Sequence, residues 1–271
     1  MKIIAEIGWN HMGDMALAQN MIDSAISSGA NVVKFQYWNP EYLTKGAWDD
    51  DGRKEIYQKA ALDLKKVELL NRHVLDAGAE FLISVFGTYG AQDISSVGLT
   101  SIKIPSHETT NLKLIKFCSE NYNYIYFSAG ASTEREIMEA HDILKEGKAN
   151  YQLMHCVSSY PLSEDRSNLL RINWLKSLNS EVGLSDHTTS TIIPASSVLL
   201  GVRTIEKHFT TDHNLPGRDN KFALEPDEFK EMVININTVL SSIEDRGLDY
   251  QEIESDTVTN YRGRWEPHDY E

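Results

Sequence analysis

Lysine and serine side chains interrupt several apolar runs of the sequence, at positions where a buried strand usually carries Val, Ile or Leu. Lys34 lies in the run NVVKFQ and Lys103 in SIKIPS, and two ammonium groups of this kind can converge on a phosphate or a carboxylate. Ser106, Ser128 and Ser185 stand at the ends of three runs, where hydroxyls and backbone N–H groups can complete an anion cradle. These residues predict a site for an anionic ligand.

Acidic and amide side chains occupy equivalent positions in other runs. Glu6 lies in KIIAEIG, Gln36 ends NVVKFQ and Glu206 lies in TIEKHF, and alternation along a strand puts them on the same faces as the lysines. Burying so many charges costs several kcal/mol each unless they are paired or bind something. One alternative is that the lysines simply pair with Glu6, Glu108 or Glu206. We favour a functional site because a purely structural role for the whole set is costly.

Two histidines end neighbouring runs near the C-terminal part of the chain. His187 and His208, together with water and ligand oxygens, form an open site typical of a borderline divalent ion such as Mn²⁺, with Mg²⁺ and Co²⁺ as alternatives. The other interpretation is a pair of supporting histidines without metal. His155 is expected on the inward face of its run with Leu153 and Val157, although a histidine within a strand can also be an ordinary core residue.

The elements that position these residues alternate regularly. The strand-like runs cover residues 2–8, 31–36, 80–85, 101–106, 124–130, 151–157, 181–186 and 204–209, and helical patterns cover 14–28, 63–78, 90–97, 111–120, 133–147, 168–178, 191–201 and 226–243. Eight such pairs predict an α/β fold, a single-domain (β/α)8 TIM barrel over residues 1–246 with a C-terminal tail over 247–271. Longer loops, 37–61 and 210–225, open on one barrel face and are candidate lids.

Composition excludes several classes of protein. The net charge of −14 disfavours nonspecific nucleic-acid binding, so we expect no nucleic-acid partner. No run approaches the ~18 apolar residues of a membrane span, and the first strand begins too early for a signal peptide. Cys118 and Cys156 fall in a predicted helix and a predicted strand, which favours reduced thiols. We therefore expect a cytoplasmic protein that acts on small molecules.

At these same residues the chain resembles the sialic acid synthase family, phosphoenolpyruvate-dependent enzymes that make nonulosonic acids. The matching strings occur in the family's order: AEIGWNHMGD (5–14), VKFQ (33–36), KIPSHE (103–108), SAGAS (128–132), LMHCVSSYP (153–161), GLSDHT (183–188) and IEKHFTTDHNLPGRDN (205–220). The combination of LSDHT, EKHFT and PGxD is highly specific. The resemblance implies a barrel that binds phosphoenolpyruvate and a metal together.

The resemblance also implies roles for individual residues. Phosphoenolpyruvate contacts map to Lys34, Lys103, Ser106, Ser128 and Ser185, metal ligands to His187 and His208, and sugar-side acids to Glu6, Glu108, Glu206 and Asp219. Gln36 and Tyr160 also fall in family motifs, and we expect both to bind substrate.

Three departures from the family pattern stand out. Asn220 replaces the histidine that usually follows the PGxD aspartate, and Ala129 replaces the threonine of the common STG string. Family members usually carry a C-terminal antifreeze-like domain that completes the partner subunit's sugar pocket with an arginine, and this sequence ends at Glu271 without room for it. We therefore expect weak discrimination at the acetamido group unless Arg262 or Arg264 substitutes, and a homodimer is left open.

The expected reaction is a condensation of phosphoenolpyruvate with an N-acetylmannosamine-like aldose, giving a 2-keto-3-deoxy sugar acid and phosphate. Lys34 and Lys103 neutralise the anion, and Glu6 or Glu206 handles the proton of the attacking water. The alternatives are the same chemistry on a non-acetylated or phosphorylated acceptor, a metal-dependent aldolase or lyase on the same fold, and a non-catalytic binding barrel.

Overall fold

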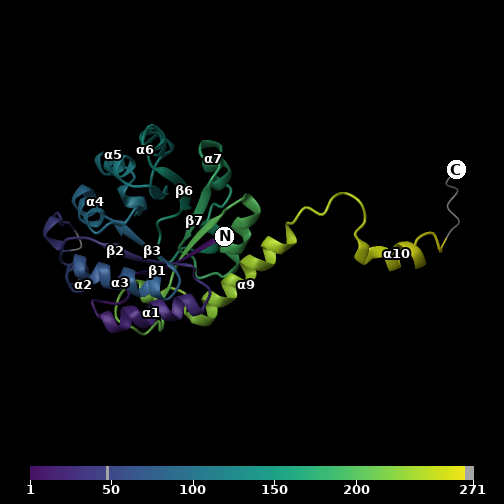
Figure 1. Cartoon of the computed structure of the whole chain (residues 1–271), viewed down its shortest axis with the longest axis horizontal. Helices are drawn as coiled ribbons and strands as arrows, with labels where there is room; N and C mark the ends of the chain where they lie inside the picture. The colour runs from purple at the N-terminus through teal and green to yellow at the C-terminus, as the bar shows by residue number, and fades with distance from the viewer. Residues whose placement is uncertain (47–48, 266–271) are drawn as a thin grey trace.

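A closed barrel of parallel strands forms the centre of the molecule (Figure 1). The computed structural model describes residues 1–46 and 49–265. Each strand pairs with the next in chain order, and the last pairs back onto the first. The strands are β1 (Lys2–Gly8), β2 (Val32–Tyr37), β3 (Glu80–Val85), β4 (Ser101–Ile104), β5 (Tyr124–Ser128), β6 (Asn150–Cys156), β7 (Val182–Asp186) and β8 (Thr204–His208). The predicted (β/α)8 barrel is confirmed.

Helices surround the barrel on its outside (Figure 1). They are α1 (Met15–Ser27), α2 (Arg53–Ala60), α3 (Leu64–Asp76), α4 (Gly87–Ser96), α5 (Leu112–Asn121), α6 (Glu134–Glu146), α7 (Arg171–Leu178), α8 (Ile192–Ser197) and α9 (Pro226–Ser242), with α10 (Ser255–Asn260) in the tail. Side-chain caps fix several starts: Asp14 accepts from the N–H groups of Ala16 and Leu17, and Thr133 and Glu136 form a capping box. No helix within the described ranges is long and apolar enough to cross a membrane.

Two apolar layers hold the barrel together. The larger layer lies between strands and helices and is built from the outward side chains of each strand. The smaller layer fills the bottom of the barrel and consists of Ile4, Val32, Leu82, Tyr126 and Met154. Above this floor the inward positions become charged or polar, so the mouth of the barrel is where the sequence departs from an ordinary core.

One predicted strand face is wrong. Met154, not Leu153, packs in the barrel floor, and the His155 Nε2 atom lies 2.8 Å from the carbonyl oxygen of Ser167, outside the barrel. The register explains the difference, since Met154 pairs with Ser128 and paired residues of neighbouring strands share a face. His155 is therefore a core histidine.

The first long loop is more structured than the sequence indicates. A 3-10 turn, η1 (Pro40–Tyr42), and helix α2 lie within the region predicted as a loop, 37–61, of which residues 47–48 are outside the described part of the chain. Gly52 immediately precedes α2 with a φ of 85°, a left-handed conformation that glycine adopts without strain. A short helix with few apolar residues gives little periodic signal, which is why the pattern missed it.

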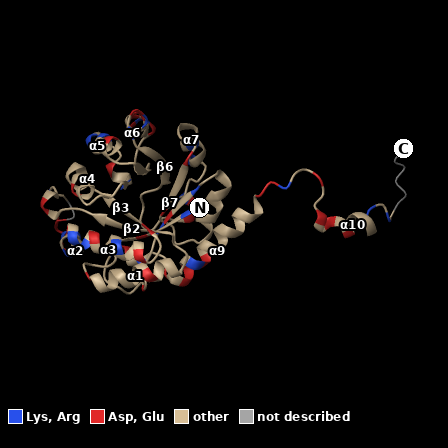
Figure 2. Cartoon of the chain, viewed as in Figure 1, with Lys and Arg blue, Asp and Glu red and all other residues tan. Residues whose placement is uncertain are grey.

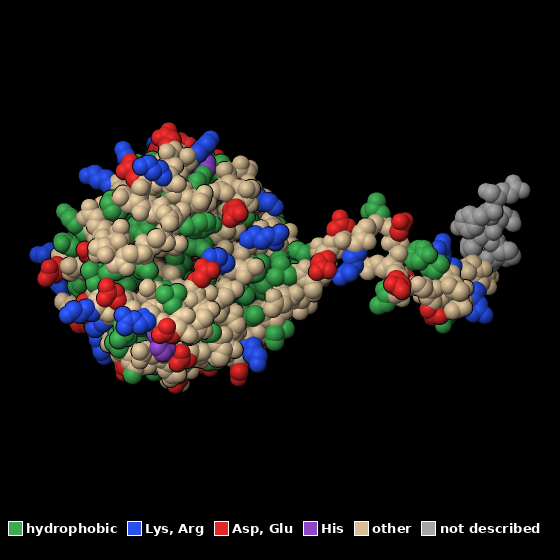
Figure 3. All heavy atoms as spheres, in the orientation of Figure 1, with side chains coloured by type: hydrophobic (Ala, Val, Ile, Leu, Met, Phe, Trp, Pro, Cys, Tyr) green, Lys and Arg blue, Asp and Glu red, His purple; other side chains and the backbone are tan. Residues whose placement is uncertain are grey.

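The tail leaves the barrel after α9 and extends away from it (Figure 1). Acidic and basic side chains are interspersed on the outer helices and along this segment (Figure 2). The tail carries exposed hydrophobic side chains, among them Leu248, Ile253 and Trp265 (Figure 3). Arg262 and Arg264 are exposed there and do not reach the barrel mouth, so they do not complete a sugar pocket in this conformation.

Candidate active site

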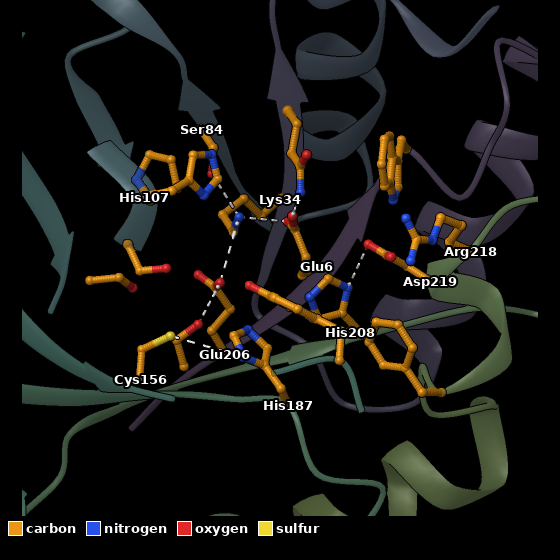
Figure 4. A pocket seen from close by; sticks show the side chains of 18 of the residues that line it. Glu6, Lys34, Ser84, His107, Cys156, His187, Glu206, His208, Arg218 and Asp219 are labelled. Carbon is orange, nitrogen blue, oxygen red and sulfur yellow. Dashed lines mark hydrogen bonds and ion pairs between the residues drawn. The ribbon is translucent and has the colours of Figure 1, made fainter. Parts of the chain in front are cut away.

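A cavity of about 680 Å³ opens at the end of the barrel where the strands finish. All but one of the site residues predicted from the sequence line it: Glu6, Lys34, Gln36, Lys103, Ser106, Ser128, Tyr160, Ser185, His187, Glu206, His208 and Asp219. They come from β1, β2, β4, β5, β7 and β8 and from the loops that follow strands, and Figure 4 shows several of them converging. The exception, Glu108, lies in the turn after β4 and accepts a hydrogen bond from Asn111.

Two lysines and two glutamates alternate in a buried charge network at the cavity floor (Figure 4). Lys34 Nζ lies 2.7 Å from Glu6 Oε2 and 3.6 Å from Glu206 Oε1. Lys103 Nζ lies 2.6 Å from Glu206 Oε2. Pairing of the lysines with glutamates was the predicted alternative to an anion site, and this pairing is present. The four charges of the network sum to zero. Such a network is weak evidence for stability, because desolvating buried ions offsets much of their attraction.

Polar neighbours fix the geometry of this network. Ser84 accepts a hydrogen bond of 2.8 Å from Lys34, Ser185 donates one of 3.0 Å to Glu206, and Gln36 donates one of 2.6 Å to Glu6. Ser84 was missed in the sequence, although it shares the inward face of β3 with Leu82 and strand alternation was the available signal.

The pKa values of the two glutamates are shifted in opposite directions. Burial raises the pKa of Glu6, and Lys34 offsets this only in part. Burial acts in the same direction on Glu206, but Lys103 and Lys34 together lower the pKa of Glu206 to about 2. When the surroundings shift the pKa values of two carboxyl groups in opposite directions, one group can exchange a proton while the other stays charged. The pKa shifts therefore favour Glu6 over Glu206 as a proton acceptor, and the sequence alone did not distinguish the two.

The two histidines lie side by side at the ends of β7 and β8, with ring centroids 5.5 Å apart (Figure 4). The His187 Nδ1 atom lies 2.8 Å from the carbonyl oxygen of Val157, so it carries the proton and Nε2 keeps its lone pair. Burial, with His187 and Lys34 nearby, lowers the pKa of His208 well below its usual value. His208 is thus neutral, the form that ligates metal ions. Burial lowers the pKa of His187, but Cys156 and the Val157 carbonyl oxygen outweigh this and raise it.

The donor set fits an open divalent site. Within the described residues, no group of three or more His, Cys, Asp or Glu side chains forms a closed metal cage. An ion here would be held by His187 and His208 and completed by water or substrate oxygens. Asp219 Oδ2 lies 3.6 Å from His208 Nδ1, and burial raises the pKa of Asp219 to about 6.

A cluster of hydroxyl groups lies beside the lysines. Ser106 Oγ and Ser158 Oγ are 2.7 Å apart, and Ser128 Oγ is buried without a hydrogen-bond partner in the described part of the chain. Leaving a buried hydroxyl unpaired costs about 1–3 kcal/mol. An anion bound to Lys34 and Lys103 would supply the missing acceptor for such a group.

Ala129 does not weaken the site. Its side chain is fully buried in the apolar layer between strands and helices, and its N–H donates to the carbonyl oxygen of Met154. Ser128 faces the cavity, and Ala129, the next residue, points to the other side of the strand. A threonine at position 129 would therefore not place its hydroxyl in the cavity.

Asn220 connects two loops of the cavity rim. Its Oδ1 accepts a 2.6 Å hydrogen bond from Thr210, while Nδ2 donates to the carbonyl oxygens of Pro216 at 2.7 Å and Asn10 at 3.3 Å. Asn10 Nδ2 donates in turn to the carbonyl oxygen of Phe209. These contacts fix the loop that carries Asp219 against the end of β1.

Asn220→Ala is expected to lower the melting temperature by about 2–8 °C, because buried groups lose partners at about 1–3 kcal/mol. Differential scanning calorimetry tests this. Asn121→Ala, at an exposed position at the end of α5, is the control and should melt like the parent. An unchanged melting temperature for Asn220→Ala would show that the loop is held by other contacts.

Aromatic rings form the outer wall of the cavity, and none of them was predicted as a site residue. Trp9, Tyr57 and Phe86 line it, with Trp38 packed behind all three at centroid distances of 6.1, 5.3 and 5.9 Å. Tyr57 belongs to the unpredicted helix α2, so only the three-dimensional structure places it here.

Comparison with known proteins agrees with this architecture. The NeuB family model matches residues 21–247. The chain is 36% identical to N,N'-diacetyllegionaminic acid synthase of Campylobacter jejuni, over 90% of this chain and 77% of that protein, and 31% identical to the pseudaminic acid synthase of the same species, over 92% and 77%. The crystal structure of N-acetylneuraminic acid synthetase from Leptospira borgpetersenii, in complex with citrate, superposes with a TM-score of 0.87 at 31% identity, covering 97% of this chain and 91% of that one. The chain belongs to the NeuB family.

Proposed function

We propose that this enzyme condenses phosphoenolpyruvate with an aldose to form a sialic-acid-type 2-keto-3-deoxy sugar acid and phosphate. The observation that carries the proposal is that Lys34 and Lys103, with the nearby serines, line the same cavity as the His187–His208 pair. The named relatives are synthases of legionaminic and pseudaminic acids, which supports this class of reaction.

The anion site positions phosphoenolpyruvate. Lys34 and Lys103 neutralise its carboxylate and phosphate, and Ser106, Ser128 and Ser185 donate hydrogen bonds to the same groups. Binding in this way holds carbon 3 of phosphoenolpyruvate toward the histidine side of the cavity. Positioning of this kind converts a bimolecular step into an effectively unimolecular one.

Carbon 3 then attacks the aldehyde carbon of the open-chain aldose, and carbon 2 becomes an oxocarbenium ion. The divalent ion, proposed as Mn²⁺, supplies Lewis-acid polarisation of the aldehyde when bound by His187 and His208. Glu206 stays ionised and stabilises positive charge near carbon 2. Glu6 accepts one proton of the water that adds at carbon 2 and passes it to the oxygen of the former aldehyde. Phosphate leaves with cleavage of its C–O bond and takes the second proton as the keto group forms.

The acceptor is proposed to be N-acetylmannosamine-like, with Asp219 hydrogen-bonded to a sugar hydroxyl and Tyr160 packed over the histidines. The Tyr160 ring centroid lies 4.1 Å from that of His187. Phosphate release from phosphoenolpyruvate, measured with a panel of acetylated, non-acetylated and phosphorylated aldoses, tests the proposal. Phosphate release that depends on the aldose supports it. Turnover of sugar acids without phosphoenolpyruvate would identify an aldolase, and no release with any aldose would contradict the proposal.

Lys34→Met and Lys103→Met are each expected to weaken phosphoenolpyruvate binding tenfold or more, since a lost charge-assisted contact costs about 1.5–3 kcal/mol. Methionine keeps the apolar stem, which limits repacking. Isothermal titration calorimetry gives the affinities, and Lys116→Met on helix α5 is the control. Parent-like affinity in both cavity variants would place the ligand elsewhere.

A further inference from the structure

A buried ion pair lies on the opposite face of β7 and β8 from the cavity. Lys207 Nζ is 2.5 Å from Asp186 Oδ2, and the two residues are 1% and 3% exposed. They are register partners of the two adjacent strands. Neither lines the cavity, and each immediately precedes a histidine that does, His187 and His208. Alternation therefore places the ion pair directly behind the histidine pair.

The loop after β7 wraps around the lysine. Lys207 Nζ also lies 2.5 Å from the carbonyl oxygen of Thr188, 3.2 Å from Thr188 Oγ1 and 3.0 Å from the carbonyl oxygen of Ser190. Asp186 accepts hydrogen bonds from the N–H and the hydroxyl of Thr188, at 3.1 and 2.8 Å. The residues on both sides of His187 are thus tied to one ammonium group on β8.

Stability alone is a poor explanation for this arrangement. Well-packed apolar side chains of similar volume generally serve a barrel as well as or better than a buried ion pair. Apolar side chains do not bind carbonyl oxygens, however, so they leave the loop after β7 free to take other paths. What the ion pair adds is a defined position for the backbone that carries His187.

We propose that Asp186 and Lys207 are positioning residues that set the separation and ring orientation of His187 and His208. The inference rests on the proposed function in one respect, that the two histidines hold a divalent ion. Its geometric content is independent of this, because His187 is further oriented by the Val157 carbonyl oxygen, 2.8 Å from Nδ1, and that contact depends on where the backbone of His187 lies.

The test uses a charge-free double variant, Asp186→Leu with Lys207→Met, and an isosteric single variant, Thr188→Val. The single variant keeps both charges and removes only the hydroxyl that contacts them. Circular dichroism checks folding, titration of Mn²⁺ alone followed by electron paramagnetic resonance gives the ion affinity, and ¹⁵N NMR of the imidazoles gives the His187 tautomer without metal. Lys116→Met, at an exposed position of α5, is the control.

In the double variant we expect a folded barrel, Mn²⁺ binding weakened tenfold or more, mixed His187 tautomers and phosphoenolpyruvate affinity within about threefold of the parent. Thr188→Val should weaken Mn²⁺ binding and mix the His187 tautomers to a smaller extent. If the double variant does not fold, Thr188→Val alone is the test. Parent-like Mn²⁺ affinity and a single His187 tautomer in the folded variants would overturn the proposal. A parent that binds no Mn²⁺, with tautomers that still change in the variants, would instead refute the metal role and leave the positioning role standing.

Discussion

Glu6→Gln is expected to lower kcat by about 10²–10⁴ while leaving phosphoenolpyruvate affinity equal to or higher than that of the parent. The amide keeps the size of the side chain but does not accept a proton from water. It also carries no charge, so Lys34, which lies 2.7 Å from Glu6, becomes more available to an anion. Steady-state kinetics with saturating aldose gives kcat, and calorimetry gives the affinity.

The control for Glu6 is Glu139→Gln on helix α6, where the carboxylate is exposed and pairs loosely with Arg135. This variant should match the parent in both measurements. Glu206→Gln should behave differently from Glu6→Gln, because it removes the partner of both lysines and so disturbs the anion site as well. If Glu6→Gln has the same kcat as the parent, a group other than Glu6 accepts the proton of the water.

His187→Ala and His208→Ala are each expected to abolish binding of the divalent ion and to reduce activity to background, with the barrel still folded. With two imidazoles as the proposed protein ligands, loss of either leaves one, too few to hold an ion in an open site. Elemental analysis of the purified variants and circular dichroism measure metal content and folding.

His73→Ala is the matched control, since His73 lies on α3 and pairs with Asp23 far from the cavity. Its metal content should equal that of the parent. Normal metal content in both His187→Ala and His208→Ala would remove the metal assignment and leave the two rings as supporting groups. Added Mn²⁺ should not restore activity to either variant if the assignment is correct.

The strands could be predicted from the sequence because each is an apolar run that ends in polar or charged residues. Polar residues within apolar runs, such as Lys34, Lys103 and Glu206, identified the mouth of the barrel before its structure was known. The same reasoning failed for β6, since alternation gives two faces and only the register with Ser128 decides which face is inward.

Other parts of the site depend on contacts that a sequence does not contain. Which glutamate keeps its charge follows from the distances to Lys34 and Lys103, and not from residue type. The outer wall depends on α2, whose Tyr57 meets Trp9 at a centroid distance of 5.1 Å across a long stretch of chain. Short helices with weak periodicity and long-range packing are the features that pattern analysis does not capture.

In the charge-neutral network of two lysines and two glutamates, an incoming anion has to compete with the carboxylates for the ammonium groups. Both ammonium groups already have carboxylate partners, so a simple anion such as sulfate gains little by displacing one of them. A molecule with a carboxylate and a phosphate at the right spacing engages both lysines at once and recovers the cost of separating two ion pairs. We therefore expect the glutamates to weaken the binding of simple inorganic anions more than the binding of a ligand that carries both groups.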